Sequence, residues 1–420
     1  MRKCRGNGRD EMNFYAKTIA AASAFMFAAS CGVTVSKTDT VPAEINISIG
    51  EETTEETLSS AAVTSQPPTE PQLSEAEKLL QTLSLHERVC QMFVVTPEQV
   101  NGCDMVTSSD ETYRSGLAEF PVGGIVLFEK NLETSEQTSQ LLADSQDISR
   151  ESCGVGLFTA IDEEGGTVAR AANKLGTTSF YGMSTYGDTC DTEAARSIGR
   201  TIGADIGALG FNVDFAPVAD VNINGLNELG SRIFSNDPDV VSQMVTAFVG
   251  GIHESGVCAT LKHFPGLGAE DGNTHYDRSV TLERSVDDLR QTEFVPFSGG
   301  IAAGADFVMV GHQKITGIGD DLPCDLSYTA VTVLLRGELG FEGLAITDSQ
   351  QMNTISGVYG SGDAAVRAIS AGIDIVLMPQ DLCTAVDTVE QAVQSGELPQ
   401  SRIDESVLRI LEKKYELGLI

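Results

Sequence analysis

The sequence predicts an α/β fold: a single (β/α)8 TIM barrel over residues 75–420, which follows a signal peptide and a disordered acidic tether. Three observations indicate the barrel: eight short apolar runs, amphipathic helical stretches between most of them, and polar residues at the ends of the runs. The runs are continuously apolar rather than alternating, as expected for parallel strands that are buried on both faces. Eight strand–helix units in a chain of this length fit one barrel with enlarged loops.

The predicted strands and helices alternate along the chain from residue 75 onward. We expect strands at residues 91–96, 124–128, 157–162, 213–218, 259–263, 307–310, 344–348 and 373–378. We expect helices at residues 75–88, 135–149, 192–206, 238–254, 285–303, 364–371, 384–394 and 404–417. A doubly wound open sheet is the competing architecture, and a glycine-rich dinucleotide loop after the first strand would favour it. The first strand instead ends in Val95-Thr96-Pro97-Glu98, so we prefer the barrel.

Residues 1–31 have the pattern of a lipoprotein-type signal peptide. Basic residues precede an apolar run at residues 18–29, which is shorter than the about 20 residues of a membrane-spanning helix. Small residues directly before Cys31 resemble a bacterial lipobox, which implies that Cys31 is lipidated and anchors an exported protein to the membrane. Plain secretion with cleavage nearby is the alternative, and the sequence leaves open whether translation starts at Met1 or Met12.

Residues 32–74 are rich in Thr, Ser, Glu and Pro and predict a disordered tether, because they cannot bury enough apolar surface to offset their ordering entropy. The whole chain carries 27 Lys and Arg against 60 Asp and Glu, a formal net charge of −33. This balance argues against nucleic-acid binding and against adhesion to anionic lipid through a basic face. The lipid anchor is therefore the one membrane contact that we expect.

The cysteines indicate packing rather than chemistry. Cys90 and Cys258 lie in apolar surroundings and are predicted core residues. No two cysteines show CxxC spacing, so we expect no metal site. No nucleotide- or flavin-binding motif indicates a cofactor. Disulfide bonds and the oligomeric state stay open.

Polar residues with chemical potential follow several of the predicted strands. Asp162 ends the third strand, Lys262 and His263 end the fifth, His312 follows the sixth and Asp348 ends the seventh. The carboxyl ends of the strands form one face of a TIM barrel, and that face holds the active site in enzymes of this fold. We therefore expect a site there, with His312 lining the same pocket.

Residues 262–275 read Lys-His-Phe-Pro-Gly-Leu-Gly-Ala-Glu-Asp-Gly-Asn-Thr-His. A loop with three glycines follows the strand and returns a further imidazole, His275, which can carry a proton near neutral pH. The segment resembles the β-N-acetylglucosaminidase branch of glycoside hydrolase family 3, where Lys-His-Phe-Pro-Gly-x-Gly is followed after four residues by Asp-Ser-His. The resemblance extends over nearly all of residues 76–420.

The resemblance implies a substrate-binding set around the first sugar. Residues 161–170 resemble the family's Asp-x-Glu-Gly-Gly-x-Val-x-Arg motif, which implies that Asp162 and Arg170 bind sugar hydroxyls. Residues 230–235 resemble the family's Glu-Arg-Ser-Phe loop, which places Arg232 at the substrate. Lys262 and His263 would hold the same sugar. With tryptophan absent, this polar contact favours a short exo-type pocket over a long aromatic-lined cleft.

The resemblance also implies the catalytic residues. Residues 346–352 match the family's nucleophile segment, which makes Asp348 the nucleophile and His275 the general acid/base. One departure concerns the aspartate that pairs with this histidine in the family, because Asn273 stands in its place. An amide can orient an imidazole but cannot stabilise an imidazolium by charge. Asp271 or Asp277 is a candidate substitute.

The leading hypothesis is a retaining exo-β-N-acetylglucosaminidase that acts on terminal β-linked GlcNAc of chitin-type or cell-wall oligosaccharides. A covalent glycosyl-enzyme on Asp348 would explain retention. Another family 3 β-glycosidase, or a phosphorylase with phosphate as acceptor, is the second hypothesis. A degenerate sugar-binding lipoprotein is the third; Asn273 is its only support, and the intact Asp348 argues against it.

Overall fold

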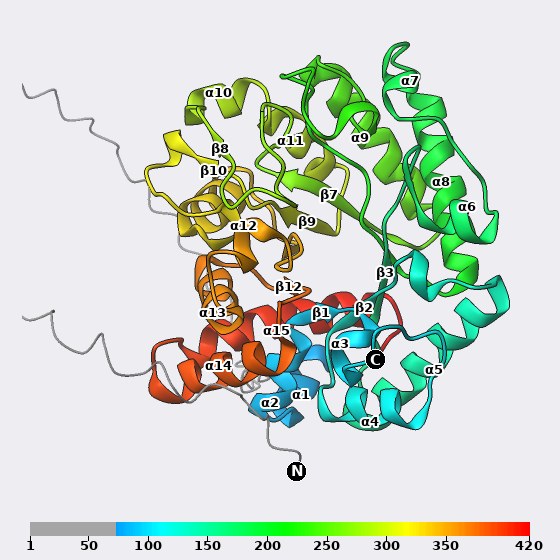
Figure 1. Cartoon of the computed structure of the whole chain (residues 1–420), viewed down its shortest axis with the longest axis vertical. Coiled ribbons are helices and arrows are strands. Elements are labelled where there is room, and N and C mark those ends of the chain that lie inside the picture. Colours follow the sequence, from blue (N-terminus) through cyan, green and yellow to red (C-terminus); the bar gives the residue numbers. More distant parts are fainter. Residues whose placement is uncertain (1–72) are drawn as a thin grey trace, which may run out of the picture. The chain divides into compact units, whose positions relative to one another are not determined.

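The computed structural model describes residues 73–420, which form one compact unit. Figure 1 shows this unit as a ring of strands with helices around it. The predicted signal peptide, Cys31 and all but the last two tether residues lie outside the described residues, so these expectations stay predictions. Among residues 73–420, no helix combines the length and the apolar character needed to cross a bilayer.

Eight parallel strands build the barrel in the described part of the chain. They are β1 (Phe93–Val95), β2 (Gly124–Val126), β3 (Phe158–Ile161), β6 (Val213–Asp214), β7 (Cys258–Phe264), β9 (Phe307–Val310), β11 (Leu344–Thr347) and β12 (Val376–Leu377). Their order is β11-β9-β7-β6-β3-β2-β1-β12, so each strand lies beside its neighbours in sequence. A parallel bridge between Ile346 and Ile375 joins the two end strands and closes the ring. All eight predicted strands are confirmed.

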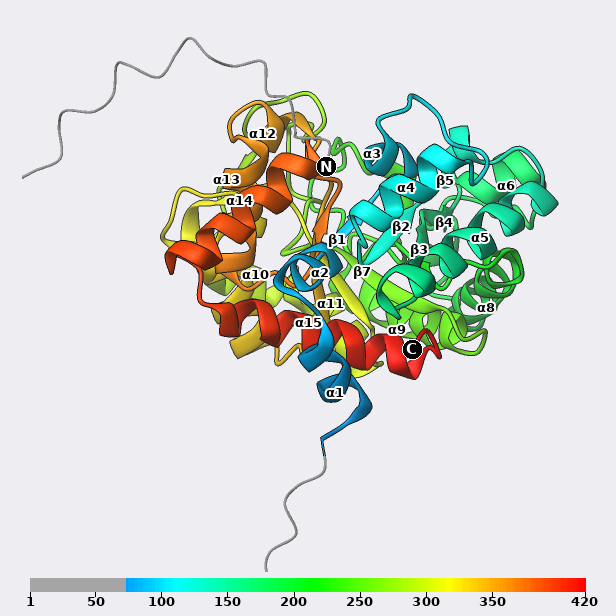
Figure 2. The same cartoon turned by 90° about the horizontal axis from the view of Figure 1, so that it is seen from below.

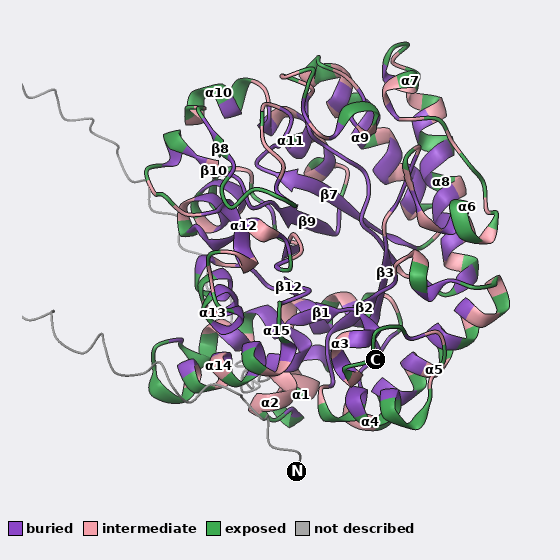
Figure 3. Cartoon of the chain, viewed as in Figure 1, coloured by how far each residue is buried: buried purple, intermediate pink, exposed green. Residues whose placement is uncertain are grey.

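Helices surround the ring and cover its outer face. The longer ones are α4 (Glu111–Glu119), α5 (Ser135–Cys153), α8 (Thr192–Leu209), α9 (Pro238–His253), α11 (Phe294–Ala302), the π-helix η5 (Thr329–Glu338), α13 (Ser361–Ala371), α14 (Leu382–Ser395) and α15 (Gln400–Glu416). The strands are buried throughout, whereas the helices turn exposed faces outward (Figure 3). Cys90 and Cys258 are 0% and 3% exposed, which confirms them as core residues.

Two predicted helices are each divided in two. The first, expected at residues 75–88, consists of α1 (Glu75–Thr82) and α2 (Leu85–Gln91). Ser84 ends the continuity because its hydroxyl accepts from the Glu87 N–H while the Glu87 carboxylate accepts from the Ser84 N–H. The expected helix at residues 285–303 likewise consists of α10 (Val286–Gln291) and α11.

The amino-terminal and carboxy-terminal helices pack together on the outside of the barrel. Figure 2 shows α1, α2 and α15 side by side, and the contacts between these elements agree. Smaller elements lie in the connection that follows the barrel strand β3. There, β4 (Glu163–Gly165) pairs with β5 (Val168–Ala169), and α6 (Arg170–Leu175) follows.

Candidate active site

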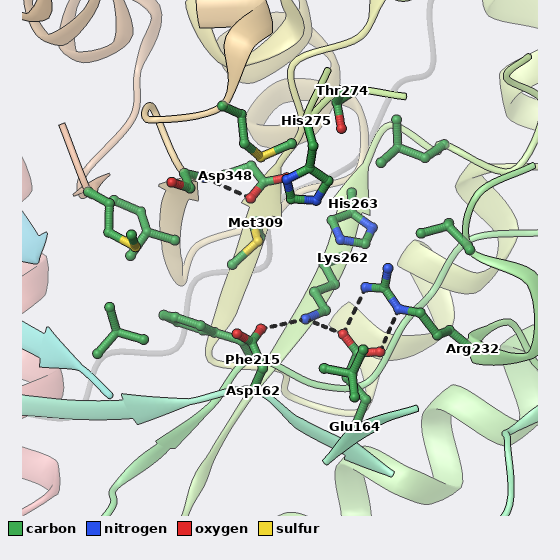
Figure 4. Close-up of a pocket in the computed structure, with 18 of the residues that line it drawn as sticks. Asp162, Glu164, Phe215, Arg232, Lys262, His263, Thr274, His275, Met309 and Asp348 are labelled. Carbon is green, nitrogen blue, oxygen red and sulfur yellow. Dashed lines mark hydrogen bonds and ion pairs between the residues drawn. The ribbon is translucent and has the colours of Figure 1, made fainter. Parts of the chain in front are cut away.

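A pocket of about 770 Å³, its open mouth included, lies at the carboxyl ends of the strands. Its floor and walls contain apolar side chains from several strands, among them Val126, Phe215, Met309 and Leu377. The polar side chains that line it are Asp162, Glu164, Arg170, Glu228, Arg232, Lys262, His263, Thr274, His275, Asp348 and Ser349. Figure 4 shows that the labelled groups of this set converge on one space from different parts of the chain.

Lys262 and Asp162 form the first part of a charged network in the pocket. The Lys262 ammonium lies 2.9 Å from Asp162 Oδ1, and Arg170 Nη2 lies 2.9 Å from Asp162 Oδ2. Lys262 comes from β7, and Asp162 directly follows β3. Burial alone would raise the pKa of Asp162, but the two cations hold that pKa well below its usual range. Asp162 is therefore ionised and fixed in place.

Glu164 is the functional carboxylate that the sequence reasoning did not single out. Its carboxylate lies 2.6 Å from Lys262 Nζ and accepts two bonds of 2.8 Å from the Arg232 guanidinium. Burial would raise the pKa of Glu164, but Lys262 and Arg232 lower it. The residue stands on β4 within the motif at residues 161–170, two residues after Asp162, where the quoted pattern has its Glu. Figure 4 shows Glu164 between Lys262 and Arg232, so it orders both cations.

His263 is held by a second carboxylate that the sequence reasoning missed, Asp220. The Nδ1 atom of His263 lies 2.8 Å from Asp220 Oδ2, and the other oxygen of Asp220 accepts from the Leu267 N–H. A cis peptide bond joins Lys262 to His263, and both side chains line the pocket. Because Asp220 occupies Nδ1, the other ring nitrogen of His263 faces the pocket.

Asp348 directly follows β11, and its side chain lines the pocket. Its Oδ1 atom accepts from the Ser349 N–H at 2.7 Å. Burial would raise the pKa of Asp348, but the charges of His312 and then His263 lower it below its ordinary value. Asp348 is therefore an ionised carboxylate at neutral pH that lines the pocket.

His312 lies behind Asp348 and is not among the pocket-lining residues, which differs from the expectation. Its Nδ1 atom lies 3.1 Å from Asp325 Oδ1, and its Nε2 atom lies 2.9 Å from the Ser349 carbonyl oxygen. Burial would lower the pKa of His312, but the buried Asp325 carboxylate raises it to about 9. The residue therefore acts on Asp348 by charge rather than by touching a ligand.

His275 reaches the pocket from the loop after β7, and Figure 4 shows its ring beside Asp348. Asn273 does not contact this ring, because its Oδ1 atom accepts from the His275 backbone N–H at 2.9 Å. The two candidate substitutes are also engaged elsewhere: Asp277 accepts from the Asn273 N–H, and Asp271 accepts from the Asn224 amide. The family's carboxylate–imidazole pair is therefore not reproduced by these three residues.

Residues 84–413 match the model of the Glycosyl hydrolase family 3 N terminal domain. The chain belongs to glycoside hydrolase family 3. The resemblance expected from the sequence motifs is thereby confirmed.

Relatives within family 3 carry β-hexosaminidase names. Beta-hexosaminidase A of Pseudoalteromonas piscicida is 32% identical over 330 residues, which cover 72% of this chain and 54% of the relative. A solved β-N-acetylglucosaminidase of family 3 from Paenibacillus sp. str. FPU-7 is 35% identical, with a TM-score of 0.76 over 80% of this chain and 63% of that chain. The chain thus spans less than two thirds of the length of these two proteins.

Another solved structure matches over nearly the whole of its chain. The β-N-acetylhexosaminidase of Beutenbergia cavernae is 30% identical, with a TM-score of 0.69 over 79% of this chain and 99% of that chain. The barrel described here is therefore similar to nearly the whole of that chain.

Proposed function

We propose that the protein is a retaining exo-β-N-acetylglucosaminidase that removes terminal β-linked GlcNAc from chitin-type or cell-wall oligosaccharides. One observation carries the proposal: an ionised carboxylate, Asp348, faces a pocket that His275 also enters and that paired cations and carboxylates line. Membership of family 3 and the hexosaminidase names of its relatives support the choice of sugar.

In the first step, the His275 imidazolium gives a proton to the glycosidic oxygen while an Asp348 oxygen attacks the anomeric carbon. The bond from that carbon to the leaving oxygen breaks, and a covalent glycosyl–Asp348 ester forms. A cationic or neutral imidazole serves well here, because a second carboxylate beside Asp348 would oppose its ionisation.

In the second step, His275 takes a proton from water, and the water oxygen attacks the anomeric carbon and releases Asp348. Two displacements on opposite faces retain the β configuration. The low pKa of Asp348 makes it a good leaving group at this stage, since the departing carboxylate is stabilised by its surroundings.

The charged network supplies the binding of the sugar. Asp162 and Glu164 accept from hydroxyl groups, and Lys262, Arg170 and Arg232 donate to them. Because each of these side chains is already held by a partner at 2.6–2.9 Å, little side-chain entropy is lost when a sugar binds. Polar contact of this kind with a single terminal sugar is what exo action requires.

The cellular setting is part of the same proposal. A lipidated Cys31 and the acidic segment at residues 32–74 would hold the barrel outside the cell, where chitin-type and cell-wall oligosaccharides are found. Metabolic labelling with a fatty-acid analogue, compared between the intact chain and Cys31→Ala, tests the anchor.

The enzymatic test measures aglycone release from p-nitrophenyl β-GlcNAc and p-nitrophenyl β-glucoside, with and without phosphate. We expect GlcNAc release that phosphate does not accelerate. Phosphate is included because a histidine acid/base admits an incoming anion better than a carboxylate does, so acceleration by phosphate would assign a phosphorylase.

A 2-fluoro-glycosyl trap followed by peptide mapping tests the nucleophile. We expect the label on Asp348, no label in Asp348→Asn, and retained labelling of Asp348 in a control variant, Asp162→Asn, that binds the sugar more weakly. A label on another residue contradicts the mechanism. Binding of GlcNAc without any turnover would instead assign a sugar-binding protein.

A further inference from the structure

Glu228 is a pocket-lining carboxylate for which the proposed mechanism has no use. It lies between β6 and α9, in the segment that also brings Arg232 to the pocket. The other carboxylates of the pocket are compensated, since Asp162 and Glu164 pair with cations and Asp348 has His312 behind it. Among the described residues, no Lys, Arg or His nitrogen lies within ion-pair distance of Glu228. Its carboxylate accepts a hydrogen bond of 3.3 Å from Thr274 Oγ1.

A second carboxyl group, Glu270, lies buried next to Glu228. Glu270 is 0% exposed, and within residues 73–420 no cation and no backbone N–H pairs with its carboxyl group, whose neighbour is the Glu228 carboxylate. Burial first, and the nearby Glu228 carboxylate second, raise the pKa of Glu270 to about 9. Glu270 therefore keeps its proton at neutral pH, and Glu228 is the member of the pair that lines the pocket.

Glu228 contacts the loop that, in the proposed mechanism, lies beside the leaving group rather than beside the terminal sugar. Its contact residue, Thr274, directly precedes His275, and both line the pocket (Figure 4). In the proposed mechanism His275 protonates the glycosidic oxygen, so the loop at residues 274–275 borders the sugar beyond the scissile bond. The hydrogen bond from Thr274 joins this loop to Glu228, which lies in the segment between β6 and α9.

We propose that Glu228 selects the sugar beyond the scissile bond by charge and favours one that carries a free ammonium group. The substrate class would be a partly de-N-acetylated β-1,4-linked glucosamine oligomer with GlcNAc at its end. An uncompensated carboxylate binds an ammonium group well and repels an anion. A muramic acid unit, which carries a lactyl carboxylate, would be disfavoured at the same place. This inference rests on the proposed function.

The test compares kcat/KM for three disaccharides at low ionic strength: GlcNAc-GlcN, GlcNAc-GlcNAc and GlcNAc-MurNAc, all β-1,4-linked. We expect the amine-bearing substrate to be preferred over the muramic acid substrate by about 100-fold, since close charges inside a pocket are weakly screened. Glu228→Gln should reduce this ratio to below about 5-fold, because the amide keeps the shape of the side chain and removes its charge. Raising the salt concentration should lessen the preference of the wild type.

The matched control is Asp271→Asn, which removes an exposed carboxylate of the same loop that is not among the pocket-lining residues. It should leave the ratio unchanged. Equal rates on all three substrates, or faster cleavage of GlcNAc-MurNAc, would overturn the inference and leave the proposed function standing. An unchanged ratio in Glu228→Gln would overturn it as well. If the wild type cleaves none of the three, nor the nitrophenyl glycoside, the proposed function fails and takes this inference with it.

Discussion

Replacing Glu164 by Gln tests whether the charged network is a binding device or only an internal salt bridge. The substitution removes the charge that holds Lys262 at 2.6 Å and the Arg232 fork at 2.8 Å. Removing one partner of a buried ion pair costs about 3–5 kcal/mol. Lys262 keeps its bond to Asp162, so we expect a loss near 3 kcal/mol in the free energy of unfolding, measured by urea denaturation.

The expected effect on activity follows from the freedom that Lys262 and Arg232 gain. Displacement of a positioning group by about 1 Å lowers the rate about 100-fold, so kcat/KM for the nitrophenyl glycoside should fall by that factor in the folded variant. The control is Glu293→Gln. Glu293 is 1% exposed and accepts a two-pronged bond from Arg284 at 2.8 and 2.9 Å, but it does not line the pocket.

The control should lose a similar amount of stability and keep the kcat/KM of its folded fraction. If Glu164→Gln lowers kcat/KM less than threefold, or if Glu293→Gln lowers it equally, the claim that Glu164 orders the sugar-binding cations is wrong.

Two further predictions concern pH. His312→Gln removes a charge that lowers the pKa of Asp348, so the acid limb of the kcat/KM profile should move to higher pH; an unmoved limb would make His312 purely structural. Burial lowers the pKa of Lys414 to about 7, so the unfolded state binds more protons and unfolding free energy should rise as pH rises from 7 toward 10. Lys414→Met should flatten that dependence. Lys414→Met should also stabilise the protein by about 2–4 kcal/mol at pH 6. Relieving the desolvation of the ammonium gains about 5 kcal/mol, and leaving the Gln91 oxygen that Lys414 bonds without a partner costs about 1–3 kcal/mol. Calorimetry at both pH values measures this.

The strands of the barrel were predictable because each is a continuous apolar run in the sequence. A strand that is buried on both faces has apolar side chains at successive positions, rather than at alternate ones. Helix ends were harder. The break between α1 and α2 was present in the sequence as Ser84 followed by Glu87, but the apolar spacing continues across it. The capping hydrogen bonds, rather than the apolar pattern, end the helix there.

The site was predictable in its members and less so in its contacts. The expected substrate-binding residues line the pocket with the exception of His312, and so do Asp348 and His275. Asn273 differs from the expectation, because it accepts a hydrogen bond from the His275 backbone instead of orienting its ring. Asp220, Glu164 and Glu228 went unassigned, because acidic side chains are common in this chain and spacing does not show which of them face a cavity.

The sequence by itself determined the strand count, the end of each strand at which polar residues gather, and the family, since these depend on local pattern and on motif spacing. The tertiary structure alone decided which carboxylates are paired. Ion pairing depends on distances between residues far apart in the chain, such as Lys262 with Asp162 and His263 with Asp220. It is this pairing that leaves Asp348 ionised and Glu228 uncompensated, and so assigns different chemistry to side chains of the same type.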